Sequence, residues 1–285
     1  MALARFFQPA DGTLLYHYCS PETFLAICSG KKLRFCDIHS MNDYMEMHWG
    51  YEVWIKAANK LLDDLGKEYL DRIDQVVGNF GGVALPLASC LSLHGDTLSQ
   101  WRAYAQDGVG FSVGFDAKAI LRMPVRPLLV CYEEDEQLEE VVDFVEKLHK
   151  VAHQNPEDQE IFFDLAFNLA VNLGAYKNPA FREEAETRLV HVLNYQPSGS
   201  GLKLIDVGGS AFGVEQDPQP VRFLMKAGCP VPHLDIDFMG AEEASPIREV
   251  IIGPRNDSLP SGISVLMETL GHSNAVIKKS KASYR

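Results

Sequence analysis

Two hydrophobic patterns alternate at the start of the chain. Residues 14–18 are a run of apolar and aromatic side chains typical of a strand, and residues 33–38 alternate in polarity as a half-buried strand does. Between them, Ser20 and Pro21 suit the N-cap and the first position of a helix. Apolar residues then recur at helical spacing up to Gly30, which suits the C′ position that ends a helix. The chain is therefore predicted to open with strand, helix and strand.

The rest of the sequence continues to mix the two patterns. Helices are predicted at residues 46–70, 97–105, 134–153, 156–176 and 259–270. Strands are predicted at residues 85–93, 108–115, 125–132, 187–195, 247–252 and 275–280. The Gly- and Ser-rich residues 198–213 are predicted to form a long connection. Because the helices gather in the middle instead of following every strand, we expect an α+β fold: a mixed, mostly antiparallel sheet with flanking helices and a central helical layer.

Length and composition favour one domain. The chain has 285 residues, of which 46% are hydrophobic, and this is enough to build a sizeable apolar core. We therefore expect a single α+β domain over residues 1–285, with residues 133–178 as a helical insertion within it. The two helices of the insertion are expected to pack on each other and on the core, with an acid-rich face in solvent.

The charge balance argues against one class of function. The 26 basic and 39 acidic residues give a net charge of −13, which disfavours a surface that coats nucleic acid or anionic lipid. Residues 132–160 hold 11 acidic and 2 basic residues, a net charge of −9, so most of the net negative charge of the chain lies in this segment. A compact basic pocket for a phosphate-bearing ligand is compatible with the net charge of −13.

Cysteine usage and hydropathy predict a cytoplasmic protein. The six cysteines have no CxxC spacing and lie in or beside apolar runs, which favours reduced, mostly buried thiols over disulfides or a metal site. The N-terminus has no export signal, and no window approaches the ~20 apolar residues that cross a bilayer. The oligomeric state stays open.

Chemistry has to come from clusters of polar residues, because the sequence contains no Walker loop, GxGxxG, GxSxG or HExxH. The first cluster is Tyr16, His17, Tyr18 and Ser20, at the end of a strand and the start of a helix. The His17 imidazole can donate to a ligand hydroxyl or phosphate, close to the unpaired N–H groups of the helix. The alternative is a histidine at the edge of the core that is hydrogen-bonded to backbone.

Two further clusters have a functional and a structural interpretation. Asn42, Asp43 and Glu46 follow the second strand and can contact a ligand, although such residues also cap helices and stabilise turns. Trp101 and Tyr104 precede a glycine-rich strand and can form a stacking platform for a base or nicotinamide, although Trp is more often used in core packing.

The sharpest cluster is Glu184, Glu186 and Arg188. On a strand, the period of two places all three on one face, where paired carboxylates beside a guanidinium suit acid–base or cation-stabilising chemistry. On a helix, Glu184 and Arg188 are an i, i+4 pair worth about 0.2–0.5 kcal/mol. Both alternatives stay open at this point.

A series of short motifs along the chain carries a family resemblance. In chain order they are Leu15-Tyr16-His17-Tyr18, Leu33-Arg34-Phe35, Met41-Asn42-Asp43 with Glu46, Cys90-Leu91-Ser92, Trp101, Tyr104, Gly108, Gly110-Phe111, then Lys177, Phe181, Glu184, Glu186, Arg188 and finally Ile251-Ile252-Gly253-Pro254. Together they resemble the bacterial family catalogued as domain of unknown function 2971. That resemblance implies membership of the family, but it does not imply any particular activity, because the function of the family is unknown.

A more distant similarity is to the ADP-ribosyltransferase fold, whose enzymes place a His or Arg, a middle aromatic or Ser and a late Glu in this order. It implies NAD as the substrate, with His17 on the ribose hydroxyls and Tyr104 or Trp101 stacked on nicotinamide. It also implies that Glu184 or Glu186 stabilises the oxocarbenium-like transition state. The remaining residues of the predicted nucleotide site are Tyr18, Ser20, Asn42 and Arg188. Glu186→Gln is then expected to abolish NAD consumption with little change in melting temperature.

Two other functions remain as alternatives. The first is a non-catalytic binding or regulatory protein in which these residues hold a mixed sheet together. The second is a metal-dependent phosphodiester enzyme that uses Asp43, Glu46, Glu184 and Glu186 around Mg²⁺.

Overall fold

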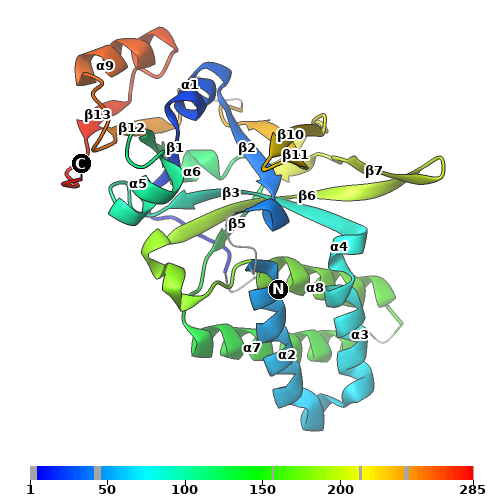
Figure 1. Cartoon of the computed structure of the whole chain (residues 1–285). Coiled ribbons are helices and arrows are strands. Elements are labelled where there is room, and N and C mark those ends of the chain that lie inside the picture. Colours follow the sequence, from blue (N-terminus) through cyan, green and yellow to red (C-terminus); the bar gives the residue numbers. More distant parts are fainter. Residues whose placement is uncertain (1–4, 42–45, 156, 212–213, 241–243, 285) are drawn as a thin grey trace.

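One large sheet runs through the molecule, and four long helices lie together beside it (Figure 1). The computed structural model describes residues 5–41, 46–155, 157–211, 214–240 and 244–284. The strands are β1 (Leu14–Cys19), β2 (Lys32–Asp37), β3 (Ala84–Ser92), β4 (Phe111–Asp116), β5 (Arg126–Leu129), β6 (Glu186–Ser198), β7 (Gly201–Ile205), β8 (Gly209–Ala211), β9 (Val214–Gln216), β10 (Arg222–Lys226), β11 (Cys229–Asp237), β12 (Ile247–Ile252) and β13 (Val276–Lys279).

The helices occur in two groups. They are α1 (Pro21–Gly30), α2 (Glu46–Leu65), α3 (Lys67–Gly78), α4 (Phe80–Val83), α5 (Leu98–Tyr104), α6 (Ala117–Ile120), α7 (Glu134–Gln154), α8 (Gln159–Leu173) and α9 (Pro260–Thr269), with 3₁₀ helices η1 (Ile38–Ser40) and η2 (Pro179–Glu184). In Figure 1, α2, α3, α7 and α8 form a layer at the bottom, while α1, α5, α6 and α9 surround the upper strands. Within the described residues, no helix combines the length and the apolar character needed to cross a membrane.

The sheet is mixed and mostly antiparallel, as expected from the sequence. Its main path runs β10-β11-β2-β3-β1-β4-β12-β13, and β6 adds a branch by pairing with β3, β5 and β7. Neighbouring strands are antiparallel throughout, except β12 and β13, which are parallel. The α+β class with flanking helices and a helical layer is therefore confirmed.

Strand β3 is the central strand of the site, and the fork is the place where β1 and β2 separate along one of its edges. Along one edge it pairs with β6 from Ala84 to Ser92. Its other edge is shared, because β2 pairs with it at Leu87 and Ala88 whereas β1 pairs with it at Ser92. Strands β1 and β2 therefore diverge beside residues 89–91. The space between them is available to side chains and to a ligand.

Two apolar clusters hold these layers together. One packs α1 and α9 on the sheet around Phe24, Phe111 and Phe115. The other lies between the helical layer and the sheet, where Trp54 of α2 and Val190 of β6 are both buried. Burying one such side chain stabilises the fold by about 1.5–3 kcal/mol. The helices of the predicted insertion, residues 133–178, thus share their core with α2 and α3, which precede them by some 60 positions.

The structure corrects several predicted boundaries. The helix predicted at residues 46–70 is two helices, because Gly66 adopts a φ of +79° that breaks the first one. Helix α1 includes Gly30, and Lys31 takes the left-handed cap with its N–H bonded to the Ile27 carbonyl. The strand predicted from Gly108 begins only at Phe111.

The predicted connection at residues 198–213 is wrong. It contains β7, which extends the β6 hairpin far from the body of the sheet in Figure 1, and β8. Strands β10 and β11 were also missed, because proline normally argues against a strand and Pro230 and Pro232 both lie within β11. Of the six thiols, three are buried and two are half-buried, whereas Cys229 is exposed.

Candidate functional site

A pocket of about 330 Å³ opens at the fork between β1 and β2, with β3 as its floor. It gathers residues that are up to 210 positions apart in the sequence. Its walls are formed by Tyr16, His17, Tyr18, Arg34, Cys36, Met41, Ala88, Ser89, Cys90, Leu91, Ser92, Gln100, Tyr104, Lys177, Glu184, Glu186 and Lys226. A larger cavity of about 720 Å³, between the N-terminal segment and α6, is mainly apolar and contains none of the predicted site residues.

His17 of β1 contacts the backbone of β3, and this contact defines its tautomer. Its Nδ1 lies 3.1 Å from the carbonyl oxygen of Cys90, and a carbonyl can only accept, so Nδ1 carries the proton. Burial lowers the pKa of His17 more than this hydrogen bond raises it. The ring is therefore neutral at pH 7, and Nε2 is an acceptor. The hydrogen bond to a backbone carbonyl is the one that the structural alternative for His17 expects, and it leaves Nε2 as the ring atom that can contact a ligand.

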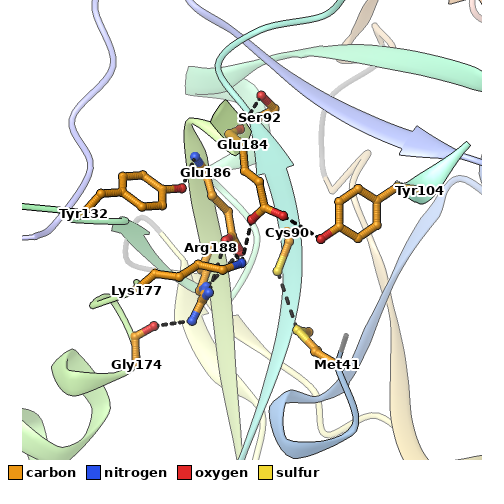
Figure 2. Close-up of polar contacts among 10 residues, drawn as sticks. All are labelled: Met41, Cys90, Ser92, Tyr104, Tyr132, Gly174, Lys177, Glu184, Glu186 and Arg188. Atoms are coloured by element: carbon orange, nitrogen blue, oxygen red, sulfur yellow. Dashed lines mark hydrogen bonds and ion pairs between the residues drawn. The ribbon is translucent and has the colours of Figure 1, made fainter. Parts of the chain in front are cut away.

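Glu184 is held by two donors from opposite sides, as Figure 2 shows. The Tyr104 hydroxyl donates to Oε1 over 2.7 Å, and the Lys177 ammonium donates to Oε2 over 2.6 Å. Only 13% of the Glu184 side chain is exposed, and it faces the pocket. Burial and the neighbouring Glu184 charge raise the pKa of Tyr104, so the phenol remains a donor across the physiological range.

Glu186 lies deeper and is bound more tightly. Arg188 donates to its Oε1 from Nε (2.8 Å) and to its Oε2 from Nη2 (3.1 Å), and Lys177 also donates to Oε2 (3.1 Å). Arg188 is fully buried, and its Nη1 donates to the carbonyl of Gly174 after α8. Burial alone would raise the pKa of Glu186, but the charges of Arg188 and Lys177 outweigh it and lower the pKa well below its usual range.

The two alternatives for the Glu184–Arg188 cluster are now resolved. Strand β6 begins at Glu186, so Glu186 and Arg188 share one face as the period of two predicts. Glu184 ends η2 and is separated from the strand by Ala185, which has a φ of +42°. The i, i+4 helical pair does not form. Instead, Lys177 brings the two carboxylates together.

Lys177 is the pocket residue that the analysis of clusters missed. It is 4% exposed and joins both carboxylates, yet in the sequence it is one lysine after an apolar helix. Its only signal was its place in the family motif series. Tyr132 was also missed: its hydroxyl accepts from the Glu186 N–H over 3.0 Å and so fixes the start of β6.

Tyr16 and Tyr18 form the wall next to His17. The Tyr18 hydroxyl donates to the carbonyl of His94 (2.8 Å) and accepts from the N–H of Thr97 (2.9 Å), so this ring cannot turn. The Tyr16 ring lies against Gly95, where an added Cβ would overlap it. The predicted Tyr18 is thus a pocket residue whose polar end is already satisfied.

Several predicted residues do not reach the pocket. Trp101 is fully buried and donates from Nε1 to Asp96 over 2.7 Å, so its ring offers no stacking surface to a ligand. Ser20 caps α1 by accepting from the N–H of Thr23, and Arg188 lies behind Glu186. Asn42 and Asp43 lie outside the described residues. Glu46 begins α2, but its side chain also lies outside them.

The arrangement of the acids does not favour a divalent cation. Lys177 is bonded to both carboxylates and thus takes the bridging position that Mg²⁺ would need. Among the side chains that the structure describes, no three His, Cys, Asp or Glu residues are grouped to hold a metal ion.

Comparison with protein families gives a match for the segment that contains Tyr104, Lys177, Glu184 and Glu186. Residues 100–189 match the family model described as "Protein of unknown function (DUF2971)". The resemblance to DUF2971 is therefore confirmed over that segment, which supplies Tyr104, Lys177, Glu184 and Glu186 to the pocket. No curated protein and no solved structure matches the chain, so the wider similarity to ADP-ribosyltransferases gains no support from these comparisons. Within the pocket, the matched segment meets residues of β1, β2 and β10, which precede and follow it in the sequence.

Proposed function

We propose that the pocket binds a nucleotide such as NAD and that the protein is an ADP-ribosyltransferase-like or NAD-consuming enzyme. The observation that carries the proposal is the convergence of His17, Tyr104 and Glu184, from β1, α5 and η2, on one pocket. A volume of about 330 Å³ lies in the range of small-molecule sites. It suits the nicotinamide and ribose half of such a ligand, with the remainder extending to the mouth.

The polar groups of the pocket select for a sugar. The neutral His17 ring offers Nε2 as an acceptor, and Glu184 offers a carboxylate. Two acceptors that face one cavity need a ligand that presents hydroxyl donors, as ribose does. The partly exposed ring of Tyr16 adds an apolar surface of the kind that packs against an aromatic base.

Glu184 is the carboxylate that suits catalysis. In the reaction, the bond between the ribose C1′ and nicotinamide breaks and its electron pair leaves with the nicotinamide nitrogen. A positive charge then develops on the ribosyl group, which a fixed carboxylate stabilises electrostatically. An acceptor hydroxyl or water bonds to C1′ and loses its proton to solvent. Glu186 is less suited to this role, because it is paired with two cations, Arg188 and Lys177, and its side chain is 6% exposed. Glu184 is paired with one cation, Lys177, and its side chain is 13% exposed.

The test is NAD turnover by purified protein, with and without cell lysate as a source of acceptor, followed as nicotinamide release and as transfer of adenylate label. We expect Glu184→Gln to lower turnover about 100-fold or more. Glu183→Gln is the matched control, because Glu183 is adjacent and exposed. The proposal fails if the protein consumes no NAD, or if Glu184→Gln consumes it as fast as Glu183→Gln.

One observation favours a second candidate, a non-catalytic nucleotide-binding protein. The two carboxylates are balanced by two buried cations, Lys177 and Arg188, as in a cluster that stabilises the fold. Such a protein would bind ADP-ribose without consuming NAD. Binding of ADP-ribose with no release of nicotinamide from NAD would therefore distinguish it from the enzyme. The metal-dependent phosphodiester enzyme has the weakest support, because Lys177 already bridges the acids.

A further inference from the structure

The mouth of the pocket carries a lysine on a rigid support. Lys226 is the last residue of β10 and pairs with Cys229 across a two-residue turn. Ala227 and Gly228 in that turn have φ values of +49° and +83°, as a tight hairpin turn requires. The backbone of Lys226 is thus fixed by the hairpin, and its side chain lines the pocket.

The partner of this lysine is neutral. The Lys226 ammonium donates to the carbonyl oxygen of Ser40 over 2.8 Å, and it forms no ion pair with any residue that the structure describes. Arg34 lines the same wall, with its guanidinium oriented by Asp235 through bonds of 2.7 and 3.1 Å. In a chain of net charge −13, an exposed cation with a neutral partner at a pocket mouth is available to an anion.

The pairing of β3 places the strands of this lysine and of the acids along its opposite edges. Ala88 pairs with Cys36 of β2, and Ser92 pairs with Glu186 of β6. Lys226 belongs to β10, on the β2 side of β3, and donates to the carbonyl of Ser40, whereas Glu186 belongs to β6 on the other edge of β3. The β6 side of the pocket therefore holds two carboxylates that are already paired with Lys177 and Arg188, whereas the β2 side holds Lys226, whose partner is neutral.

We propose that Lys226, assisted by Arg34, binds the phosphate groups of the ligand whose sugar lies against Glu184. This inference rests on the proposed function and specifies which side of the pocket holds the phosphate groups of its nucleotide. An ammonium donates short, charge-assisted hydrogen bonds to phosphate oxygens. Arg34, already oriented by Asp235, presents its remaining N–H groups to the same wall.

The experiment measures calorimetric binding of ADP-ribose and of inorganic pyrophosphate to the full chain. Lys226→Met is compared with Lys203→Met, which removes the same charge from an exposed position on β7 outside the pocket. We expect Lys226→Met to weaken both ligands about tenfold or more and to flatten the dependence of Kd on salt, whereas Lys203→Met binds as the unaltered chain does. Equal affinities, or equal losses, in the two variants would overturn the inference.

NAD turnover separates this inference from the proposed function. If both ligands bind through Lys226 but NAD is not consumed, the phosphate site stands and the enzymatic proposal fails. If NAD is consumed and Lys226→Met leaves its KM unchanged, the enzymatic proposal stands and the phosphate site fails.

Discussion

The Tyr104 hydroxyl donates a 2.7 Å hydrogen bond to Oε1 of Glu184, a residue 80 positions further along the chain. This bond joins the last residue of α5 to the last residue of η2, two elements that lie in contact. It also leaves Lys177 to hold the other carboxylate oxygen, so the orientation of Glu184 is fixed at both oxygens.

Tyr104→Phe is expected to release one side of Glu184. Removing one partner of a part-buried hydrogen bond costs about 0.5–1.5 kcal/mol, which urea unfolding measures. In the proposed reaction it should lower kcat for NAD consumption more than it raises KM, because it loosens the group that meets the developing charge. Tyr195→Phe is the control, since the Tyr195 hydroxyl has no hydrogen bond to a described residue. Equal effects of the two substitutions would contradict the role of Tyr104.

Glu186→Gln and Glu184→Gln are expected to separate stability from activity. Glu186 neutralises a fully buried Arg188, and removing one member of a buried ion pair costs about 3 kcal/mol or more. The sequence-based expectation that Glu186→Gln leaves the melting temperature nearly unchanged is therefore revised. Glu184→Gln keeps its packing and loses mainly the pairing with Lys177, so its melting temperature should fall less. Thermal unfolding measures the melting temperature of both variants. A lower melting temperature for Glu184→Gln than for Glu186→Gln would contradict this prediction.

Glu186 also predicts how stability depends on acid. Its pKa is lowered in the folded state from an ordinary value of 4.5. The unfolded chain therefore binds this proton first as the pH falls, and protonation favours unfolding. The stabilisation is complete well above pH 4.5 and is lost progressively below it, towards the lower folded-state pKa. Urea unfolding of wild type and Glu186→Gln between pH 7 and pH 3 should show the difference in unfolding free energy shrinking with acid. A constant difference would contradict the assignment.

The sequence predicted what local patterns determine. The helix start at Ser20 and Pro21 follows from capping chemistry, and the shared face of Glu186 and Arg188 follows from the period of a strand. The divergence of β1 and β2 beside β3 could not be predicted, because it depends on the pairing of strands that lie some 50 to 75 positions from β3. The pocket exists only because of that divergence.

Individual roles within the site depended on contacts that a sequence does not contain. The tautomer of His17 follows from the carbonyl of Cys90, 73 positions away. Trp101 was predicted to stack on a ligand because its residue type suits that role, but the carboxylate of Asp96 satisfies its indole N–H inside the core. The role of Lys177 could not be predicted, because it depends on the positions of Glu184 and Glu186 around its ammonium group.

The support of α5 comes from the C-terminal residues. Asp96, which precedes α5, accepts from the hydroxyl of Ser280 (2.5 Å) and from the N–H of Lys281 (2.7 Å). Asp107, which follows the helix, accepts from the hydroxyl of Tyr284 (2.7 Å). Both ends of the helix that carries Tyr104 are thus tied to one short segment after β13.

Removing that segment should loosen α5 without unfolding the sheet. We expect truncation after Lys279 to speed backbone hydrogen exchange in α5 about tenfold or more, because the hydrogen bonds of Asp96 and Asp107 with the segment are worth about 0.5–1.5 kcal/mol each. Exchange in β3 and β6, which pair along nine residues, should stay near that of the full chain. Tyr284→Phe removes one of these bonds and should give a smaller change in the same direction. Uniform acceleration across α5 and β3 would mean that the segment stabilises the whole fold, and unchanged exchange in α5 would mean that it supports nothing.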